Sequence, residues 1–315
     1  MMITITQKIK NCIRSLTPYG LVMLYRQRKD PIETVYAEKM MEIKNFFLNL
    51  NSNKEKREIV EIIEYFKRYE FSTMIPYEYI RNYNAAHIDV FYDKLNKTRY
   101  VVFENKRLYF PDEWSVLQIQ SYYNNLIIEQ DESSPHRYTT EEFKVKDGDI
   151  IADIGAAEGF WALQNIEKAS KVYLFECESV WVNALRKTFE PWEEKIFIVN
   201  KYVSDINNKK NLTLDNYFED QRINFIKVDI EGMESKMLKG SREILQRNDN
   251  LTILLCTYHQ QDDAIKFKEL LEKMKFVTEY SKGYMLCFFY LNLKEPYIRH
   301  GLIRAKKYVC DKPEI

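Results

Sequence analysis

The sequence has little glycine, proline or cysteine and no long hydrophobic run. Its 315 residues include 8 Gly and 8 Pro, which excludes a collagen-like or low-complexity chain. Five cysteines without a CxxC pair leave an odd thiol, unlike a disulfide framework or a zinc site. The longest apolar stretch, residues 284–293, is about half of a membrane span, and we interpret it as a buried strand. These absences predict a globular, cytoplasmic protein.

Excess charge of either sign is also missing, because 47 basic and 47 acidic residues cancel. Nucleic acid is therefore not expected as a partner. Residues 1–29 are basic on their own, and their apolar positions recur at helical spacing. This segment is interpreted either as an amphipathic helix in peripheral contact with the inner face of a membrane or as a helix docked on the protein body. The interrupted apolar run and the missing A-x-A site argue against a secretory signal.

The remaining chain divides by its periodicity into an accessory region, residues 31–138, and a second domain, residues 139–315. Apolar residues at helical spacing predict two helices between residues 31 and 70, and the capping-box spacing of Ser52 and Glu55 places the start of the second. Residues 88–110 predict a small antiparallel β-meander, followed by a helix over 113–129 that Asp112 caps. With the basic segment 1–30, this gives three consecutive parts.

Strand and helix patterns alternate after residue 140. Short β-rich runs occupy 149–153, 171–176, 196–199, 223–229 and 251–258, and helical segments occupy 160–168, 179–189, 233–246 and 261–274. This order predicts an α/β fold with a doubly wound, Rossmann-like parallel sheet. Ligands of such sheets bind at the carboxyl ends of the strands.

The first of these strands leads into the turn DIGAAEG, residues 153–159. Gly155 and Gly159 permit close approach of a ligand, while Ala156 and Ala157 are small. The dinucleotide pattern G-x-G-x-x-G is absent, which argues against a nicotinamide enzyme. Glu176 ends the second strand, where its carboxylate can accept both hydroxyls of an adenosine ribose.

The fourth strand ends in VDIEGME, which brings Asp229, Glu231 and Glu234 together. Clustered carboxylates repel one another unless a cation or hydrogen bonds compensate, and a cationic sulfonium group suits this need. Alternatively, Glu231 and Glu234 only complement the dipole of the following helix.

These motifs resemble the FkbM family of S-adenosylmethionine-dependent methyltransferases, which have the class I methyltransferase fold. The resemblance rests on DIGAAEG, Glu176, LTLDNYF at 212–218 and INFIKVDIEGMESKMLKG at 223–240, and more softly on SPHRY at 134–138 and TYH at 257–259. It covers about the second half of the chain. It implies that S-adenosylmethionine is the cofactor and that the turn residues surround its methionine part. These cofactor residues are Asp153, Gly155, Ala156, Ala157, Gly159 and Glu176, with Ser204 and Asp205 on the adenine side.

Methyl transfer to a hydroxyl requires an aligned acceptor and a base for its proton. His259, after the fifth strand, is the first candidate base, with Asp229 as the second catalytic residue. His136 is a weaker candidate base and is grouped with the acceptor-binding residues. Lys227, Glu231 and Tyr258 complete that group, and no metal ion is assigned.

The sequence therefore predicts a SAM-dependent O-methyltransferase that acts on a small-molecule or glycan acceptor, as in surface-polysaccharide or secondary-metabolite synthesis. Two alternatives remain open, an NAD-dependent oxidoreductase on a Rossmann-like sheet and a non-catalytic adaptor. The oligomeric state is not predicted.

Overall fold

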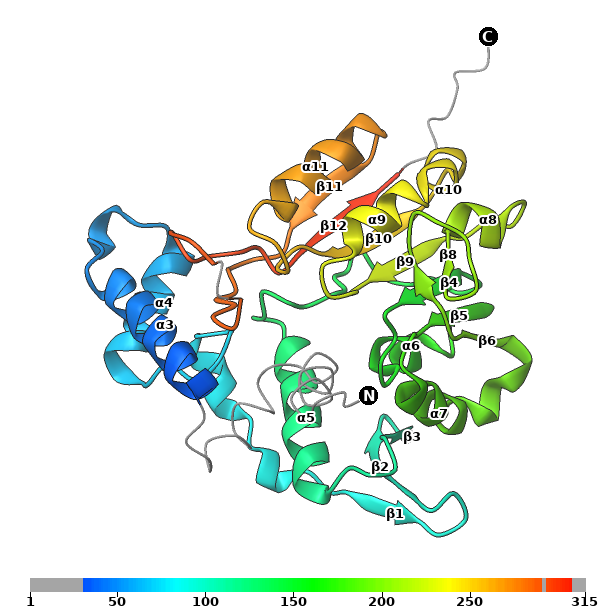
Figure 1. Ribbon diagram of the computed structural model, residues 1–315, viewed down its shortest axis with the longest axis horizontal. Helices are drawn as coiled ribbons and strands as arrows, with labels where there is room; N and C mark the ends of the chain where they lie inside the picture. The colour runs from blue at the N-terminus through cyan, green and yellow to red at the C-terminus, as the bar shows by residue number, and fades with distance from the viewer. Residues whose placement is uncertain (1–30, 291–292, 308–315) are drawn as a thin grey trace, which may run out of the picture. The chain divides into compact units, whose positions relative to one another are not determined.

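The computed structural model describes residues 31–290 and 293–307, which form two compact units (Figure 1). Unit 1 contains residues 31–88, 115–137 and 282–301, and unit 2 contains residues 89–114, 138–281 and 302–307. The units thus interleave along the chain, which differs from the consecutive segments 31–138 and 139–315 expected from the sequence. The predicted amphipathic segment 1–30 lies outside the described residues.

Unit 1 is built around three helices, as the apolar periodicity predicted. They are α3 (Pro31–Leu48), α4 (Arg57–Arg68) and α5 (Val116–Glu129), with the short 3-10 helices η1 (Ser52–Lys54), η2 (Glu78–Asn82) and η3 (Ala85–His87). Phe47 of α3 and Phe66 of α4 are buried with ring centroids 5.7 Å apart. Burial of such apolar side chains stabilises helices of this length, which are marginal alone.

Helix starts in unit 1 differ from the predicted positions. Ser52 opens η1 rather than α4, because the side chain of Asn51 accepts from the Asn53 N–H and caps that short turn. The predicted cap Asp112 is also wrong. Ser115 caps α5 through a capping box with Gln118, which satisfies two backbone N–H groups that a helix start leaves free.

Unit 1 also contains the apolar stretch that the sequence analysis interpreted as a strand. Met285, Leu286, Cys287 and Phe288 are fully buried, so the expected burial is correct. Within residues 284–290 and 293, the described part of this stretch, no strand is formed. Met285 makes an isolated antiparallel bridge with Arg299, and Leu286 N–H donates to the Met74 carbonyl at 2.8 Å.

Unit 2 holds a seven-stranded sheet of order β11-β12-β10-β9-β4-β5-β6 (Figure 1). Its strands are β4 (Ile150–Ile154), β5 (Lys171–Phe175), β6 (Ile196–Val199), β9 (Phe225–Val228), β10 (Thr252–Cys256), β11 (Val277–Tyr280) and β12 (Leu302–Lys306). The five predicted strands are parallel, but β12 runs antiparallel to both β10 and β11. The predicted α/β class is confirmed, with the correction that the sheet is mixed.

Helices flank this sheet between successive strands, as expected for βαβ units. They are α6 (Phe160–Asn165), α7 (Ser179–Thr188), η4 (Glu190–Lys195), α8 (Leu214–Phe218), α9 (Glu234–Lys239), α10 (Arg242–Arg247) and α11 (Asp263–Lys273). The predicted helix 233–246 is two helices, since Gly240 separates α9 from α10. A two-stranded sheet, β7 (Tyr202–Val203) and β8 (Asn211–Leu212), follows β6.

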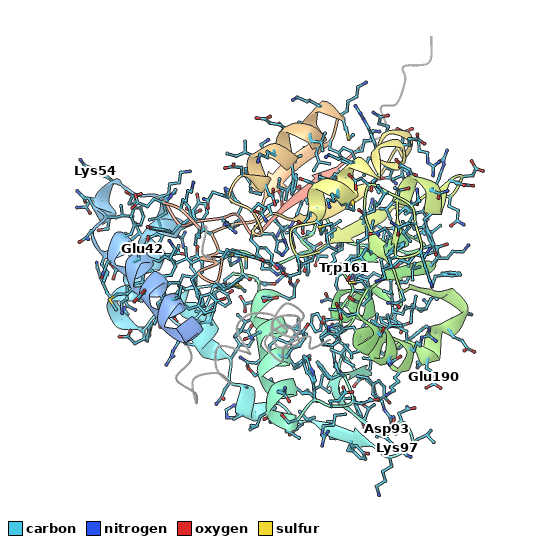
Figure 2. The ribbon with its side chains drawn as sticks, in the orientation of Figure 1. Glu42, Lys54, Asp93, Lys97, Trp161 and Glu190 are labelled. Atoms are coloured by element: carbon cyan, nitrogen blue, oxygen red, sulfur yellow. The ribbon has the colours of Figure 1, made fainter. Side chains whose placement is uncertain are left out.

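The predicted meander is also present, as β1 (Phe91–Asp93), β2 (Thr98–Phe103) and β3 (Lys106–Tyr109). It belongs to unit 2, where β3 packs on α6 and α7. Figure 2 marks Asp93 and Lys97 at its β1–β2 turn. Within residues 31–290 and 293–307, no helix is both long and apolar enough to span a membrane.

Candidate functional site

The turn between β4 and α6 packs tightly against the protein itself. Gly155 has φ +76, and a Cβ there would lie 1.9 Å from the carbonyl oxygen of Asp229. Gly159 has φ +82, and a Cβ would lie 2.6 Å from the Phe189 ring. The predicted close approach of a ligand at both glycines stays a prediction, and their close neighbours in the protein are the atoms named above. Glycine is therefore required at both positions to seat the turn on its own unit.

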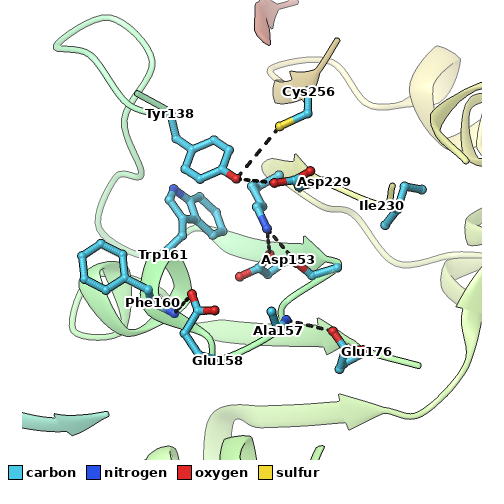
Figure 3. A network of polar contacts seen from close by, with 12 residues as sticks. Tyr138, Asp153, Ala157, Glu158, Phe160, Trp161, Glu176, Asp229, Ile230 and Cys256 are labelled. Carbon is cyan, nitrogen blue, oxygen red and sulfur yellow. Dashed lines mark hydrogen bonds and ion pairs between the residues drawn. The ribbon is translucent and has the colours of Figure 1, made fainter. Parts of the chain in front are cut away.

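Glu176, just after β5, is held by the same turn (Figure 3). One carboxylate oxygen accepts from the Ala157 N–H at 2.9 Å, and the other accepts from the Glu178 N–H at 2.7 Å. The side chain is 6% exposed, and burial raises its pKa. Each carboxylate oxygen can accept a further hydrogen bond, so this fixed carboxylate retains the capacity that two ribose hydroxyls require.

Other residues assigned to the cofactor lie near this edge of the sheet. Ala156 is buried and its N–H donates to the Phe175 carbonyl at 3.1 Å. Asn200, which was not among the residues assigned to the cofactor, follows β6 and donates from its side chain to the Glu176 carbonyl at 2.8 Å. Ser204 and Asp205 follow β7, where the Ser204 hydroxyl donates to Asp205 at 3.2 Å. Ser204 is buried, and its predicted adenine contact stays a prediction.

Asp153, at the end of β4, forms a buried ion pair with Lys227 of β9. The two residues are register partners on adjacent parallel strands, and the Lys227 Nζ lies 3.0 Å from the Asp153 carboxylate. The same ammonium donates to the Gly155 carbonyl at 2.8 Å and lies 5.3 Å from the Tyr138 ring centroid. Burial alone would lower the pKa of Lys227, but the nearby carboxylates raise it above its usual value. Lys227 thus supports the cofactor turn, and its predicted acceptor contact stays a prediction.

Asp229 follows β9 and accepts hydrogen bonds from two tyrosines. Tyr138 donates its hydroxyl to one oxygen at 2.9 Å, and Tyr258 donates to the other at 3.2 Å. The Asp229 side chain keeps 19% of its surface exposed. Figure 3 shows Tyr138 and Asp229 on the side of Asp153 opposite Glu176. Asp229 is therefore a hydrogen-bonded but accessible carboxylate.

His259 lies behind Asp229 and is almost fully buried, at 1% exposure. Its Nδ1 is 2.8 Å from a Glu234 oxygen, and its Nε2 is 3.5 Å from Asp229 and 3.8 Å from Glu231. Burial alone would lower the pKa of His259, but these three carboxylates raise it to about 9. The imidazole is therefore protonated at neutral pH and carries the cation that the sequence analysis expected the acidic cluster to need.

A fourth carboxylate, Asp263 of α11, adjoins the same cluster. Burial and the negative charge of Glu234 raise its pKa to about 6. Ligand atoms of Asp229, Glu234 and His259 lie within 4.8 Å of one another, close enough for a shared cation. Because His259 already neutralises part of this charge, the cluster is understood without a metal ion, and we assign none.

His136 belongs to unit 1, whereas Asp229 and His259 belong to unit 2. Its buried ring nitrogen Nδ1 lies 3.5 Å from the Glu129 carboxylate of the same unit. The predicted role of His136 in binding the acceptor stays a prediction.

Two residues of the site were missed or undervalued by the sequence analysis. Tyr138 was noted only as the last letter of SPHRY, although its contact with Asp229 spans 91 positions. Glu234 was left open as a helix-dipole residue, yet it is fully buried and bonds His259. Its position five residues after Asp229 could have indicated a turn that folds back, as the hydrogen bond from Ile230 N–H to its carboxylate now shows.

Comparison with known proteins finds a match to one protein family. Residues 193–284 match the family model of the methyltransferase FkbM domain, which confirms the predicted resemblance. The matched segment includes Asp229, Glu234, Tyr258 and His259. No curated protein matches the chain significantly.

Several solved structures are similar at low identity. A methyltransferase FkbM from Methylobacillus flagellatus KT is 16% identical with a TM-score of 0.44, over 60% of this chain and 54% of that protein. A precorrin-6y C5,15-methyltransferase from Geobacter metallireducens is 12% identical with a TM-score of 0.37, over 53% and 83%. An rRNA methylase from Streptococcus thermophilus is 16% identical with a TM-score of 0.37, over 52% and 89%. The chain thus spans about half the length of the Methylobacillus protein.

Proposed function

We propose that the FkbM-type methyltransferase domain of this chain transfers a methyl group from S-adenosylmethionine to a hydroxyl group of a sugar or glycan precursor. The observation that carries the proposal is that the segment matching the family model supplies Asp229 and His259 at the sheet edge where Glu176 also lies. Carboxyl ends of parallel strands are where such sheets bind ligands.

The cofactor assignment rests on Glu176. Its buried carboxylate is fixed by two backbone N–H groups and keeps unused acceptor capacity, so binding ribose hydroxyls requires no rearrangement of the side chain. Cys177 follows Glu176 in the chain, and burial together with the charge of Glu176 raises the pKa of its thiol to about 12. Tyr202 is 46% exposed and offers an aromatic face on the adenine side.

The chemistry supplied by bound S-adenosylmethionine is an electrophilic methyl group on sulfur, whose transfer releases a neutral thioether. The acceptor oxygen forms the new C–O bond and must lose its proton. Asp229 is the accessible carboxylate that takes this proton, while Tyr138 and Tyr258 hold its two oxygens in place. Holding the acceptor beside this carboxylate contributes chiefly through alignment.

His259 acts on this step through Asp229. With a pKa of about 9, it carries a proton at pH 7 and positions the Asp229 carboxylate as a charged partner. The base role expected from the sequence would require His259 to lose that proton first. The pH dependence of activity distinguishes the two roles. If His259 is the base, the enzyme gains activity as pH rises through 9, and if His259 is a positioning cation, the enzyme loses activity over the same range.

The decisive test is binding of S-adenosylhomocysteine, measured by calorimetry on the full chain. Replacing Glu176→Gln removes the charge of the hydrogen-bond acceptor and should weaken binding at least about tenfold. The exposed Glu178 provides a matched control, since Glu178→Gln keeps the backbone N–H that holds Glu176. Equal losses in both variants would refute the ribose assignment.

Other outcomes decide between the remaining functions. Failure of the unaltered protein to bind S-adenosylhomocysteine would refute the methyltransferase proposal, and binding of NADH instead would favour the oxidoreductase. Binding without methyl transfer to any sugar hydroxyl would favour the adaptor. With an acceptor in hand, Asp229→Asn should reduce kcat strongly with little change in cofactor affinity.

A further inference from the structure

Unit 1 contains a cavity of about 370 Å³ that the proposed methyl transfer does not use. Its walls come from α4, the segment after it, η2 and α5. All lining residues belong to unit 1. The volume lies at the lower end of the range for small-molecule sites, about 300–1,000 Å³.

Two neighbouring asparagines of α5 line this cavity with unused polar atoms. Within the described residues, Asn124 Oδ1 and Asn125 Nδ2 are buried and have no hydrogen-bond partner. Asn125 is 7% exposed, so its amide is more than nine-tenths buried. Leaving a buried donor and a buried acceptor unsatisfied costs about 1–3 kcal/mol each, and such groups are rare in folded proteins. Hydroxyl groups of a ligand can satisfy one unused donor and one unused acceptor on the same cavity wall.

The charges of the lining nearly balance. Arg81 is the basic residue of the wall and stacks over the Tyr69 ring, 4.9 Å from its centroid. Glu129 is the acidic one and lies 3.5 Å from the His136 ring. With its single guanidinium partly directed to an aromatic ring, the cavity has little positive charge to attract a phosphate. A neutral ligand therefore fits it best.

Hydroxyl, amide and aromatic groups complete the wall. Ser72, Thr73 and Asn84 contribute polar atoms, while Tyr65 and Tyr83 contribute aromatic rings. The Tyr83 hydroxyl donates to Asp131, which fixes the ring. Aromatic faces pack against C–H groups, whereas the amides exchange hydrogen bonds in both directions.

We infer that this cavity is a second binding site, for a neutral polyhydroxylated ligand such as one sugar unit, with Asn124 and Asn125 contacting its hydroxyl groups. The inference does not depend on the proposed methyl transfer. A purely apolar ligand would leave both amides unsatisfied, and an acidic sugar would face Glu129. The ligand class follows from the donor and acceptor pattern of the wall.

The test is saturation-transfer difference NMR on the full chain with glucose, galactose, mannose and N-acetylglucosamine at millimolar concentration. Glucose 6-phosphate and glucuronic acid serve as charged comparisons. At least one neutral sugar should give a saturating signal, and Asn124→Ala and Asn125→Ala should each weaken its binding at least about fivefold. Asn82→Ala, on an exposed asparagine of η2, is the matched control and should leave binding unchanged.

Asn125→Leu distinguishes an asparagine that binds a ligand from one that only supports the fold. Replacing an unsatisfied buried amide by an apolar group of similar size should raise the melting temperature while binding of the neutral sugar is lost. S-adenosylhomocysteine binding in unit 2 should be unchanged in all these variants, which distinguishes this inference from the methyltransferase proposal. No signal from any neutral sugar, preferential binding of a charged one, or equal binding by the asparagine variants would overturn it.

Discussion

Unit 2 should lose stability as pH rises above neutrality, because His259 then loses the proton that the surrounding carboxylates hold. In the folded protein, the carboxylates of Glu234, Glu231 and Asp229 raise the pKa of His259 from its usual 6.5 to about 9. A raised pKa means that the folded state binds the proton more tightly, so the stabilisation is present below pH 6.5 and is lost as pH rises through 9. The difference corresponds to about 3 kcal/mol, a large fraction of the stability of a typical domain.

The assay can be confined to unit 2, because all four tryptophans lie there. Guanidinium unfolding followed by tryptophan fluorescence at pH 6.5 and 9.5 gives the free energy of unfolding at each pH. The wild-type protein should lose about 3 kcal/mol more than His259→Gln over this interval. Asp263, whose pKa is raised to about 6, titrates mainly below the interval and contributes little.

The control is His87→Gln, because His87 is exposed and belongs to unit 1. Its unfolding should follow the wild-type protein at both pH values. Parallel pH dependence of the wild-type protein and His259→Gln would refute the reasoning. A direct titration of the His259 ring by NMR is feasible with four histidines in the chain, and a midpoint near 6.5 would refute it equally.

Two further substitutions test the packing that supports the cofactor turn, both by tryptophan-detected unfolding. Gly155→Ala places a Cβ 1.9 Å from a backbone oxygen and should lower the free energy of unfolding by more than about 4 kcal/mol. The control Gly148→Ala, at φ +86 with open space around it, should lower it by about 1–2 kcal/mol. Similar losses in both variants would contradict the packing argument. Lys227→Met leaves the Asp153 carboxylate buried without its cation and should lower the free energy of unfolding by about 3–5 kcal/mol. Adding Asp153→Asn should recover part of that loss. No recovery would exclude the ion pair as the cause.

The parallel strands could be predicted because each is a short, continuous apolar run. β4, β5, β9 and β10 are buried on both faces or nearly so, whereas the edge strand β6 is only partly buried. Runs rich in β-branched residues are typical of covered strands. Their order along the chain then fixed which strand ends carry Asp153, Glu176 and Asp229. The sequence therefore predicted the sheet edge at which the site lies.

The features of the fold and the site that the sequence did not predict depend on contacts between distant parts of the chain. The antiparallel strand β12 and the assignment of residues 282–301 to unit 1 involve pairings with segments far earlier in the sequence, and local periodicity carries no information on them. Likewise Tyr138 reaches Asp229 across 91 positions. A tyrosine at the edge of a motif has no local signal that distinguishes it from a core residue.

The two ends of the site differ in how their buried charges are compensated. Asp153 and Lys227 form a one-to-one pair at 3.0 Å, so these two buried charges compensate each other. Around His259, four carboxylates share a single cation, so the acceptor end keeps a net negative charge at neutral pH. Under the proposed function, that charge favours a positively charged sulfonium over the neutral thioether left after transfer. Neutralising it should therefore reduce the preference for S-adenosylmethionine over S-adenosylhomocysteine while leaving the shared ribose contact at Glu176 intact.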